Sequence, residues 1–429
     1  MNNISTVILA AGKSTRYKRK TTKLLEDLAG LPLISHVHKI GTKISGKNVI
    51  IVCNRNNIKE FKKIITGCKF VIQNKQKGTA DAISCAKPYL KSANFLILFG
   101  DAPLISLKSI NKLVLNFKKN NSIASMIAFN ASNPVGYGRV KKQKDKVLKV
   151  VEEINTTTEE KKINLCNSGV MIVNSKKFFQ NLDKIKTNKL KNEKYLPDIF
   201  EIYNNLKIPF SYIISPETEM LGVNTIEDFV KVDRIYQKYL VNNFISKGVL
   251  IQNPDTCRFS FDTIIQSGAI IESNVVIKKG VKILKDTIIK SFSYLEGVII
   301  RQNASIGPFA RIRPDTIISK NVKIGNYVEV KNSYVGDFSS VSHLSYIGDA
   351  KIGKKVNVGA GTITCNYDGK QKNKTIIRDG AFIGSNSSLI APIIINKNAK
   401  IAAGSVINKN IPSNYLAIER SKLKLVKKN

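Results

Sequence analysis

The chain lacks the features that would place it in a membrane or outside the cell. No stretch of its 429 residues approaches the ~20 uncharged apolar residues of a transmembrane helix. No basic segment precedes the first short apolar run, so we expect no secretory signal. The six cysteines are scattered without a CxxC pair, which is typical of reduced cytosolic thiols and argues against a disulfide framework or a thiolate zinc site. We therefore expect a cytoplasmic protein without a membrane partner.

Acidic residues are also scarce. The chain has 69 lysine and arginine residues against 31 aspartate and glutamate residues, a net charge of +38. A nucleic-acid-binding protein would concentrate this charge in a stripe, with aromatic residues between the cations. Here lysine is spread along the whole chain, so we interpret the excess as compositional drift and expect no nucleic-acid partner. Anionic substrates would still benefit from the positive field.

Residues 1–226 alternate short apolar runs with segments of helical spacing. This rhythm predicts a Rossmann-like α/β domain whose mostly parallel sheet is covered by helices on both faces. The clearest predicted strands are 6–10, 48–53, 95–99 and 168–173. Residues 227–247 carry one apolar stripe at helical spacing, which predicts a helical arm that links two domains.

The period becomes six in the last part of the chain, residues 248–429. Steps of six from Ile264 to Val330 meet twelve positions, and ten of these are Ile or Val; the exceptions are Lys282 and Tyr294. After two slips, the spacing continues without a miss from Ile377 to Ile407. Such hexapeptides each supply one short strand and one inward aliphatic residue. We predict a left-handed parallel β-helix of about nine coils, with the positions met by these steps facing inward.

A basic loop follows the first predicted strand. Residues 12–23 hold six lysine or arginine residues and no acid, a composition suited to binding phosphate groups. The loop is not a P-loop, because Val7 stands where that motif needs its first glycine. Asp101 follows the apolar run 95–99, where a carboxylate needs a partner. Mg²⁺ shared with substrate phosphates is a natural partner there.

Together with four segments of the repeat region, these residues identify a family resemblance. The segments are GPFARIRP (307–314), EVK (329–331), SHLSYIGD (342–349) and NVGAGTITCNYDG (357–369). The chain resembles the bifunctional N-acetylglucosamine-1-phosphate uridylyltransferases and glucosamine-1-phosphate acetyltransferases, over essentially its whole length and in their domain order. The resemblance implies an α/β nucleotidyltransferase domain, an acetyltransferase β-helix, UTP and acetyl-CoA as co-substrates, and a homotrimer.

In the first domain, the resemblance implies attack of a sugar 1-phosphate on the α-phosphate of UTP. Asp101 and Asn224 would bind Mg²⁺, and Arg16 and Lys23 would stabilise the phosphates. The sugar would contact Gly138, Glu152 and Asn167. The residues implied at the nucleotide are Leu9, Ala10, Ala11, Gly12, Gln73, Gly78, Thr79, Phe99 and Gly100. The sequence departs from the family's usual residues at Ser14, Tyr17, Thr22, Asp81 and Phe99.

In the β-helix, the resemblance implies that His343 is the general base for acetyl transfer. An imidazole titrates in the range needed to take a proton from an attacking amine. The resemblance also implies that Glu329 orients this base. Glucosamine 1-phosphate would contact Arg313, Lys331, Tyr346 and Asn357. The residues implied at acetyl-CoA are Ala360, Asn366, Tyr367, Ser385, Ala403 and Arg420.

Several alternative functions would require different residues. A β-helix carbonic anhydrase needs three histidine ligands, and the repeat region holds one of the chain's three histidines. Another nucleotidyltransferase, such as one that uses glucose 1-phosphate, would not need His343 and its surroundings. A regulatory subunit of a translation exchange factor would be expected to lose Arg16, Lys23, Asp101 or His343. A nucleic-acid-binding role rests on charge alone and predicts steeply salt-dependent binding.

Overall fold

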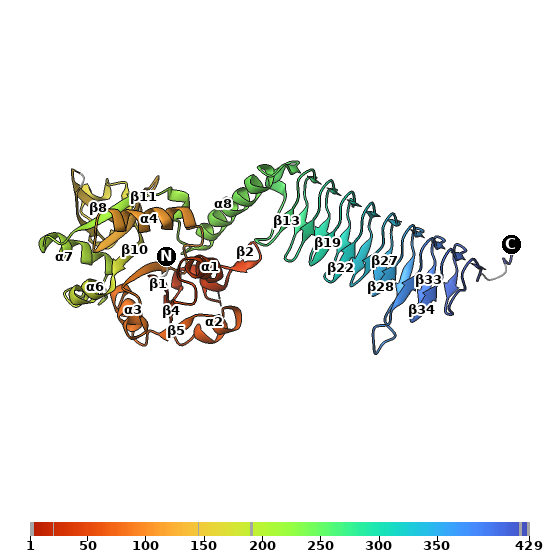
Figure 1. The fold of residues 1–429 in the computed structure, drawn as a ribbon, viewed down its shortest axis with the longest axis horizontal. Helices are drawn as coiled ribbons and strands as arrows, with labels where there is room; N and C mark the ends of the chain where they lie inside the picture. Colours follow the sequence, from red (N-terminus) through yellow and green to blue (C-terminus); the bar gives the residue numbers. More distant parts are fainter. Residues whose placement is uncertain (1–3, 20, 145, 189–191, 420–422, 427–429) are drawn as a thin grey trace. The chain divides into compact units, whose positions relative to one another are not determined.

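The computed structural model describes residues 4–19, 21–144, 146–188, 192–419 and 423–426. These residues form two compact units, Met1–Ile235 and Tyr236–Asn429, shown in Figure 1. The division falls inside helix α8 (Ile226–Ile245), which occupies most of the segment expected to form the arm. Across the described residues, no helix is long and apolar enough to cross a membrane.

The first unit is built on a nine-stranded mixed sheet in the order β11-β7-β10-β6-β1-β4-β5; β8 also pairs with β10, and β9 pairs with β8. The predicted mostly parallel sheet is confirmed: β6, β1, β4 and β5 are parallel to one another, and β11 is parallel to β7. The predicted strand 168–173 lies in β10, which is antiparallel to its neighbours β6 and β7. The strands are β1 (Ile4–Ala10), β4 (Val49–Cys53), β5 (Lys69–Ile72), β6 (Asn94–Phe99), β7 (Ala124–Asn130), β8 (Gly138–Gln143), β9 (Lys146–Val151), β10 (Leu165–Asn174) and β11 (Phe210–Ile214).

Both faces of this sheet are buried, each under its own hydrophobic cluster. Successive residues of a strand point to opposite sides, so neighbouring residues belong to different clusters. Val7 of β1 lies in one core cluster and Ile8 in the other. Helices α3, α6 and α7 contribute to the first cluster, and α1, α2 and α4 to the second. The helices are α1 (Leu33–Ser45), α2 (Ile58–Ile64), α3 (Thr79–Ala86), α4 (Leu107–Lys119), α5 (Thr158–Lys161), α6 (Ser175–Leu182) and α7 (Ile199–Asn205). A short hairpin, β2 (Asp27–Leu28) with β3 (Leu31–Pro32), precedes α1.

The second unit is a left-handed parallel β-helix, as predicted. Its three faces are parallel sheets of ten, eight and eight strands, and Figure 1 shows their strands stacked coil upon coil. The first face holds β12 (Leu250–Ile251), β14 (Ile270–Ile271), β17 (Ile288–Ile289), β20 (Ser305–Ile306), β23 (Lys323–Asn326), β26 (Ser340–His343), β29 (Asn357–Val358), β32 (Phe382–Ile383), β35 (Lys400–Ile401) and β37 (Leu416–Ala417).

The other two faces have the same short strands. The second holds β13 (Ile264–Ile265), β16 (Lys282–Ile283), β19 (Val298–Ile300), β22 (Thr316–Ile318), β25 (Tyr334–Val335), β28 (Ala350–Ile352), β31 (Thr375–Ile377) and β34 (Ile393–Ile395). The third holds β15 (Val276–Ile277), β18 (Tyr294–Leu295), β21 (Arg311–Ile312), β24 (Glu329–Lys331), β27 (Tyr346–Gly348), β30 (Ile363–Cys365), β33 (Ser388–Ile390) and β36 (Val406–Ile407).

The predicted inward register is wrong for the first coils and right from Ile300 onward. Ile264 is 49% exposed, whereas its neighbour Ile265 is 4% exposed. The inward residues continue at six-residue steps to Leu295, and a five-residue step to Ile300 then restores the predicted register. Several of these strands carry two adjacent aliphatic residues, so their sequence cannot show which one faces inward. The correction explains why a lysine and a tyrosine stand at positions 282 and 294, which face outward.

Residues one coil apart stack at the corners, where positive φ angles turn the chain. One such column includes Phe292, Phe309, Tyr327 and Leu344. Its rings stack with centroids 4.9 Å apart for Phe292 and Phe309 and 5.1 Å apart for Phe309 and Tyr327. The column runs along the corner beside His343, so the coil spacing there is fixed by ring contacts as well as by the strands.

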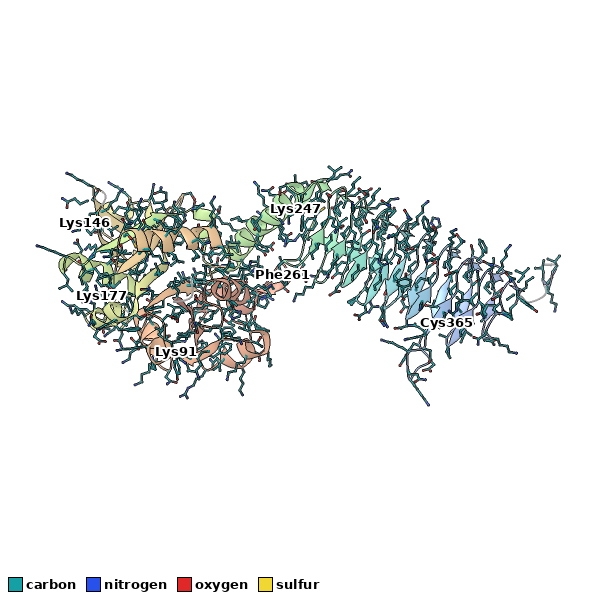
Figure 2. All side chains as sticks on the ribbon, in the orientation of Figure 1. Lys91, Lys146, Lys177, Lys247, Phe261 and Cys365 are labelled. Atoms are coloured by element: carbon teal, nitrogen blue, oxygen red, sulfur yellow. The ribbon has the colours of Figure 1, made fainter. Side chains whose placement is uncertain are left out.

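Lysine side chains project from the surfaces of both units. Figure 2 labels Lys91, Lys146 and Lys177 on the first unit and Lys247 on the second. All four are exposed.

Candidate active sites

The first candidate site lies at the carboxyl ends of β1, β5 and β6, which lie at one edge of the sheet because these strands run parallel. A cavity of about 420 Å³ opens there. The predicted nucleotide residues that line it are Leu9, Ala10, Ala11, Gly12, Lys23, Gln73, Gly78, Thr79, Phe99 and Asp101. Gly100 lies just beneath, with its N–H donating to the carbonyl oxygen of Leu9. The structure thus brings together residues predicted from four separate segments.

The cavity has further walls that the sequence analysis missed. They are Lys13, Thr15, Leu24, Gln76, Ala82, Glu193 and Tyr195. Glu193 and Tyr195 come from a loop more than a hundred residues away from Gly78. That loop packs so closely on Gly78 that a Cβ there would lie 2.4 Å from the backbone oxygen of Lys194. Gly78 also has φ +98°, so its glycine is required both for space and for conformation.

Four polar side chains form a network at the phosphate side of the site. Lys23 Nζ lies 2.6 Å from Asp101 Oδ2 and donates to Asn224 Oδ1 at 2.9 Å. Arg16 Nη2 donates to the same Asn224 oxygen at 3.1 Å. Two predicted phosphate-binding cations therefore contact the two predicted metal ligands.

Asp101 and Asn224 fit a divalent cation by the chemistry of their donor atoms. Both present oxygens to one positively charged group, the Lys23 ammonium. Mg²⁺ prefers such oxygens and needs only one or two from the protein when substrate phosphates supply others. Within the described ranges there is no group of three or more His, Cys, Asp or Glu side chains suited to a metal. The pair of Asp101 and Asn224 has only one side chain of these types, so that absence does not bear on it.

The predicted sugar residues also lie together. Gly138 of β8 is the register partner of Asn167 of β10. A Cβ on Gly138 would lie 3.6 Å from Glu152 Oε1. Burial, with a smaller contribution from the Asp198 carboxylate, raises the pKa of Glu152 to about 7. No ion pair involves Glu152 among the described residues, and a largely buried carboxyl of this kind is suited to hydrogen bonding with sugar hydroxyls.

The second candidate site centres on His343, which is exposed at the end of β26. Its Nδ1 lies 2.8 Å from Asn326 Oδ1, the residue one coil earlier in register. A carbonyl oxygen accepts the Nδ1 proton and leaves Nε2 free to accept another. Gly325 permits this approach, because a Cβ there would lie 1.8 Å from the oxygen of Ser342.

Glu329 has a different partner from the one expected. Its Oε1 accepts a hydrogen bond from Arg313 Nη1 at 2.8 Å, and its Oε2 lies 3.7 Å from Arg311 Nη1. The carboxylate raises the pKa of Arg313. The ring partner of His343 is the amide of Asn326, a residue not named from the sequence. The repeat spacing could have predicted this contact, because Asn326 and His343 occupy equivalent positions of consecutive coils.

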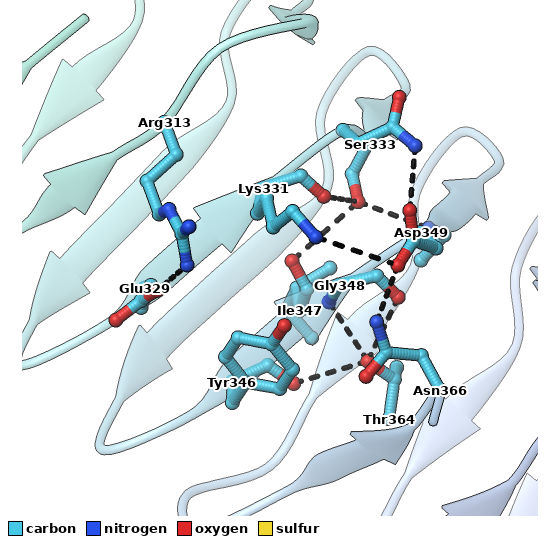
Figure 3. Close-up of polar contacts among 12 residues, drawn as sticks. Arg313, Glu329, Lys331, Ser333, Tyr346, Ile347, Gly348, Asp349, Thr364 and Asn366 are labelled. Atoms are coloured by element: carbon cyan, nitrogen blue, oxygen red, sulfur yellow. Dashed lines mark hydrogen bonds and ion pairs between the residues drawn. The ribbon is translucent and has the colours of Figure 1, made fainter. Parts of the chain in front are cut away.

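Figure 3 shows Lys331, Asp349 and Asn366 converging beside the Arg313–Glu329 pair. The Asp349 carboxylate accepts from Asn332 Nδ2 at 2.5 Å and from Asn366 Nδ2, and Lys331 Nζ lies 3.9 Å away. Burial alone would raise the pKa of Asp349, but the two amide hydrogen bonds and the Lys331 ammonium hold it below its ordinary value. Asp349 is the last residue of the SHLSYIGD segment (342–349), and the sequence alone indicated no role for it.

A loop after β30 brings another cation to this cluster. The Lys331 ammonium lowers the pKa of Lys372 by direct contact. Two ammonium groups beside each other favour an anion, such as a sugar phosphate.

The two other residues predicted at glucosamine 1-phosphate are Tyr346 and Asn357. Tyr346 lies over Gly348, where a Cβ would lie 2.5 Å from the Tyr346 hydroxyl oxygen. Asn357 is exposed on the neighbouring strand β29, one coil beyond Ser340 of β26.

Three predicted acetyl-CoA residues share the corner of His343. Backbone hydrogen bonds connect His343 to Gly361, Ala360 to Asn386 and Ser385 to Gly404 in successive coils. His343, Ala360, Ser385 and Ala403 each stand directly before one of the corner residues Leu344, Gly361, Asn386 and Gly404. Tyr367 is 61% exposed on the loop after β30. Arg420 lies outside the described residues.

Three family descriptions match parts of the chain. Residues 6–162 match the MobA-like NTP transferase domain, residues 294–368 match the GMPPB C-terminal domain, and residues 374–409 match the bacterial transferase hexapeptide with six repeats. The first match covers the residues that line the cavity of the first unit except Glu193 and Tyr195. The other two cover most of the β-helix, including His343.

Full-length relatives are also similar. The protein named Bifunctional protein GlmU from Bartonella bacilliformis is 39% identical, covering 98% of this chain and 95% of its own length. Its namesake from Agrobacterium fabrum is 37% identical, covering 97% of this chain and 93% of the relative. That from Ruthia magnifica is 38% identical over 98% of this chain and 97% of the relative.

Proposed function

The chain belongs to the family of the bifunctional protein GlmU, and on this basis we propose how its residues divide two reactions between its units. It is an enzyme that acetylates glucosamine 1-phosphate with acetyl-CoA. It then transfers UMP from UTP to N-acetylglucosamine 1-phosphate and releases pyrophosphate. The observation that carries the residue assignment is the His343–Asn326 pair, which leaves Nε2 as a free proton acceptor on the β-helix.

In acetyl transfer, the amine of glucosamine 1-phosphate attacks the thioester carbonyl carbon of acetyl-CoA. A C–N bond forms, the C–S bond breaks, and His343 Nε2 accepts the proton that the amine loses. Asn326 holds the opposite ring nitrogen. Arg313 and Lys331 bind the sugar phosphate, with Glu329 fixing the Arg313 guanidinium. Tyr346 and Asn357 contact the sugar.

Acetyl-CoA is proposed to lie along the corner that His343 shares with three residues of later coils. It would contact Ala360, Ser385, Ala403, Asn366, Tyr367 and Arg420. Hexapeptide β-helices commonly form trimers, and we propose a homotrimer with acetyl-CoA bound between neighbouring copies. We place the enzyme in the cytoplasm, where both nucleotide substrates are available.

In uridylyl transfer, a phosphate oxygen of N-acetylglucosamine 1-phosphate attacks the α-phosphorus of UTP in line with the departing pyrophosphate. Arg16 and Lys23 neutralise the charge on the transferring group. Asp101 and Asn224 would hold Mg²⁺, which when bound would offset triphosphate charge. Gln73, Gly78 and Thr79 would hold the uridine. Gly138, Glu152 and Asn167 would hold the sugar.

A single reaction mixture tests the assignment. Glucosamine 1-phosphate, acetyl-CoA, UTP and Mg²⁺ should yield CoA, pyrophosphate and UDP-N-acetylglucosamine. His343→Ala should stop CoA release while uridylyl transfer to supplied N-acetylglucosamine 1-phosphate continues, and Asp101→Ala should do the reverse. Loss of both activities in each folded variant would contradict the assignment of separate sites.

A further inference from the structure

The amide group of Gln73 is held in one orientation before any ligand binds. Its Nε2 donates to Asp81 Oδ2 at 2.7 Å and to the carbonyl oxygen of Gly78 at 3.1 Å. A carboxylate and a carbonyl oxygen can only accept hydrogen bonds, so the NH₂ group must face both. The alternative amide flip would bring Oε1 against two acceptors. Gln73 is 4% exposed, which leaves little room for another rotamer.

This orientation determines what Gln73 can offer to a ligand. Both Nε2 protons are used within the protein, and among the described residues Oε1 accepts no hydrogen bond. Because Gln73 lines the nucleotide cavity, the group that it presents there is an acceptor only. The N3–H of uracil is a donor, whereas N3 of cytosine is an acceptor. A fixed Oε1 therefore suits uracil and repels the matching edge of cytosine.

We propose that Asp81 is a positioning residue that gives the uridylyl site its preference for uracil over cytosine by locking the Gln73 amide. Asp81 lies in the first turn of α3 and does not line the cavity, so it acts through Gln73. This position is one where the sequence departs from the family's usual histidine. The proposal rests on the proposed function, since it assumes that this cavity binds UTP.

Removal of Asp81 would free one Nε2 proton and leave the amide held by Gly78 alone. The side chain could then turn and present either group to the base. We expect Asp81→Ala to lower the ratio of kcat/KM for UTP to that for CTP by about tenfold or more, since one charge-assisted hydrogen bond is lost. The change should appear mainly in KM, because the base is remote from the α-phosphorus. Asp81→Asn keeps an acceptor oxygen and should stay within about threefold of the unmodified enzyme.

The test measures pyrophosphate release with UTP, CTP and dTTP, with N-acetylglucosamine 1-phosphate and Mg²⁺. Thymine has the same N3–H as uracil. The ratio of kcat/KM for UTP to kcat/KM for dTTP should therefore stay nearly constant in Asp81→Ala. An unchanged ratio of kcat/KM for UTP to that for CTP would overturn the proposal. If activity falls equally with both nucleotides, the role of Asp81 is purely structural; if activity does not fall, Asp81 has no role in base preference. If Asp81→Ala does not fold, Asp81→Ser supplies the same test, because serine suits a first helical turn but is too short to reach Gln73.

Failure of the proposed function would look different. In that case the unmodified enzyme would release no pyrophosphate with any of the three nucleotides. If the unmodified enzyme uses UTP and the variants keep its base preference, only the role of Asp81 is refuted.

Discussion

Nδ1 of His343 and Oδ1 of Asn326 lie 2.8 Å apart on consecutive coils of the β-helix. The bond fixes the tautomer of the imidazole, because the amide oxygen accepts the only ring proton of the neutral form. The nitrogen available to a substrate amine is therefore Nε2. Loss of this bond would leave a base that can rotate and that spends part of its time in the wrong tautomer.

We expect Asn326→Ala to lower kcat for acetyl transfer by about 10- to 100-fold, as is typical when the partner of a functional histidine is removed. Uridylyl transfer should be unchanged. Asn326→Asp keeps the acceptor and adds a negative charge that favours the protonated imidazolium, so it should move the acidic limb of the pH profile to higher pH. Stopped-flow detection of free CoA across pH measures both effects. Full acetyl transfer in Asn326→Ala would contradict the role.

Lys23 Nζ contacts the oxygens of Asp101 and Asn224 that we propose as Mg²⁺ ligands, so the ammonium and the metal would compete for them. We expect Lys23→Met to reduce kcat for uridylyl transfer by about 10²–10³-fold, because a preorganised positive charge is lost. Without the ammonium, Mg²⁺ alone should raise the melting temperature more in the variant than in the unmodified enzyme. Thermal unfolding with and without Mg²⁺ measures this difference. The control is Lys63→Met, which breaks an exposed ion pair with Glu60; an equal response in both variants would refute the competition.

Burial of Glu152 makes the stability of the first unit depend on pH. Its pKa is raised from the ordinary value of 4.5 to about 7, so the folded chain keeps the proton that the unfolded chain releases. The stabilisation is complete below pH 4.5 and is lost as pH rises through about 7. Relative to Glu152→Gln, the unmodified enzyme should lose stability across this window and then level off. Denaturant unfolding at several pH values measures it, with the exposed Glu159→Gln as control. A difference that stays constant with pH would show that Glu152 is not a raised-pKa group.

Asp349 contacts Lys331, which we propose to bind glucosamine 1-phosphate, and Asn366, which we propose to bind acetyl-CoA. Asp349→Ala leaves the buried amide of Asn366 and the exposed amide of Asn332 without their acceptor. We expect the free energy of unfolding to fall by about 1–3 kcal/mol, mainly through Asn366. KM should rise for glucosamine 1-phosphate and for acetyl-CoA together. Steady-state kinetics and denaturant unfolding measure these changes. Asp379→Ala, which removes only a corner hydrogen bond to the Lys354 N–H, should leave both KM values unchanged.

The strands and helices of both units follow from patterns that are local in the sequence. The four apolar runs predicted as strands in the first unit are strands, because buried β-structure needs continuous apolar residues. The direction of β10 was not predictable, since an antiparallel strand inside a mixed sheet carries the same apolar run as a parallel one. The inward register of the first coils was mispredicted because Ile264 and Ile265 are chemically alike.

The site residues divide along similar lines. Residues at strand ends, such as Gly12 and Asp101, could be placed because parallel strands bring their carboxyl ends to one edge. Tyr195 could not, because it reaches the nucleotide cavity from a distant loop. Its place depends on the close packing of that loop against Gly78.

The arrangement of an α/β unit followed by a β-helix could be predicted from the sequence, because the spacing of apolar residues shows which faces of each element must be buried. The sequence also determined which residue types stand at the strand ends. The repeat spacing places Asn326 and His343 on consecutive coils, but their hydrogen bond, like those of Asp349 with Asn366 and of Asp81 with Gln73, is known only from the folded structure. Hydrogen bonds need partners within about 3 Å in a defined direction, and that proximity is set by coil stacking and helix packing, which no single segment of the sequence contains.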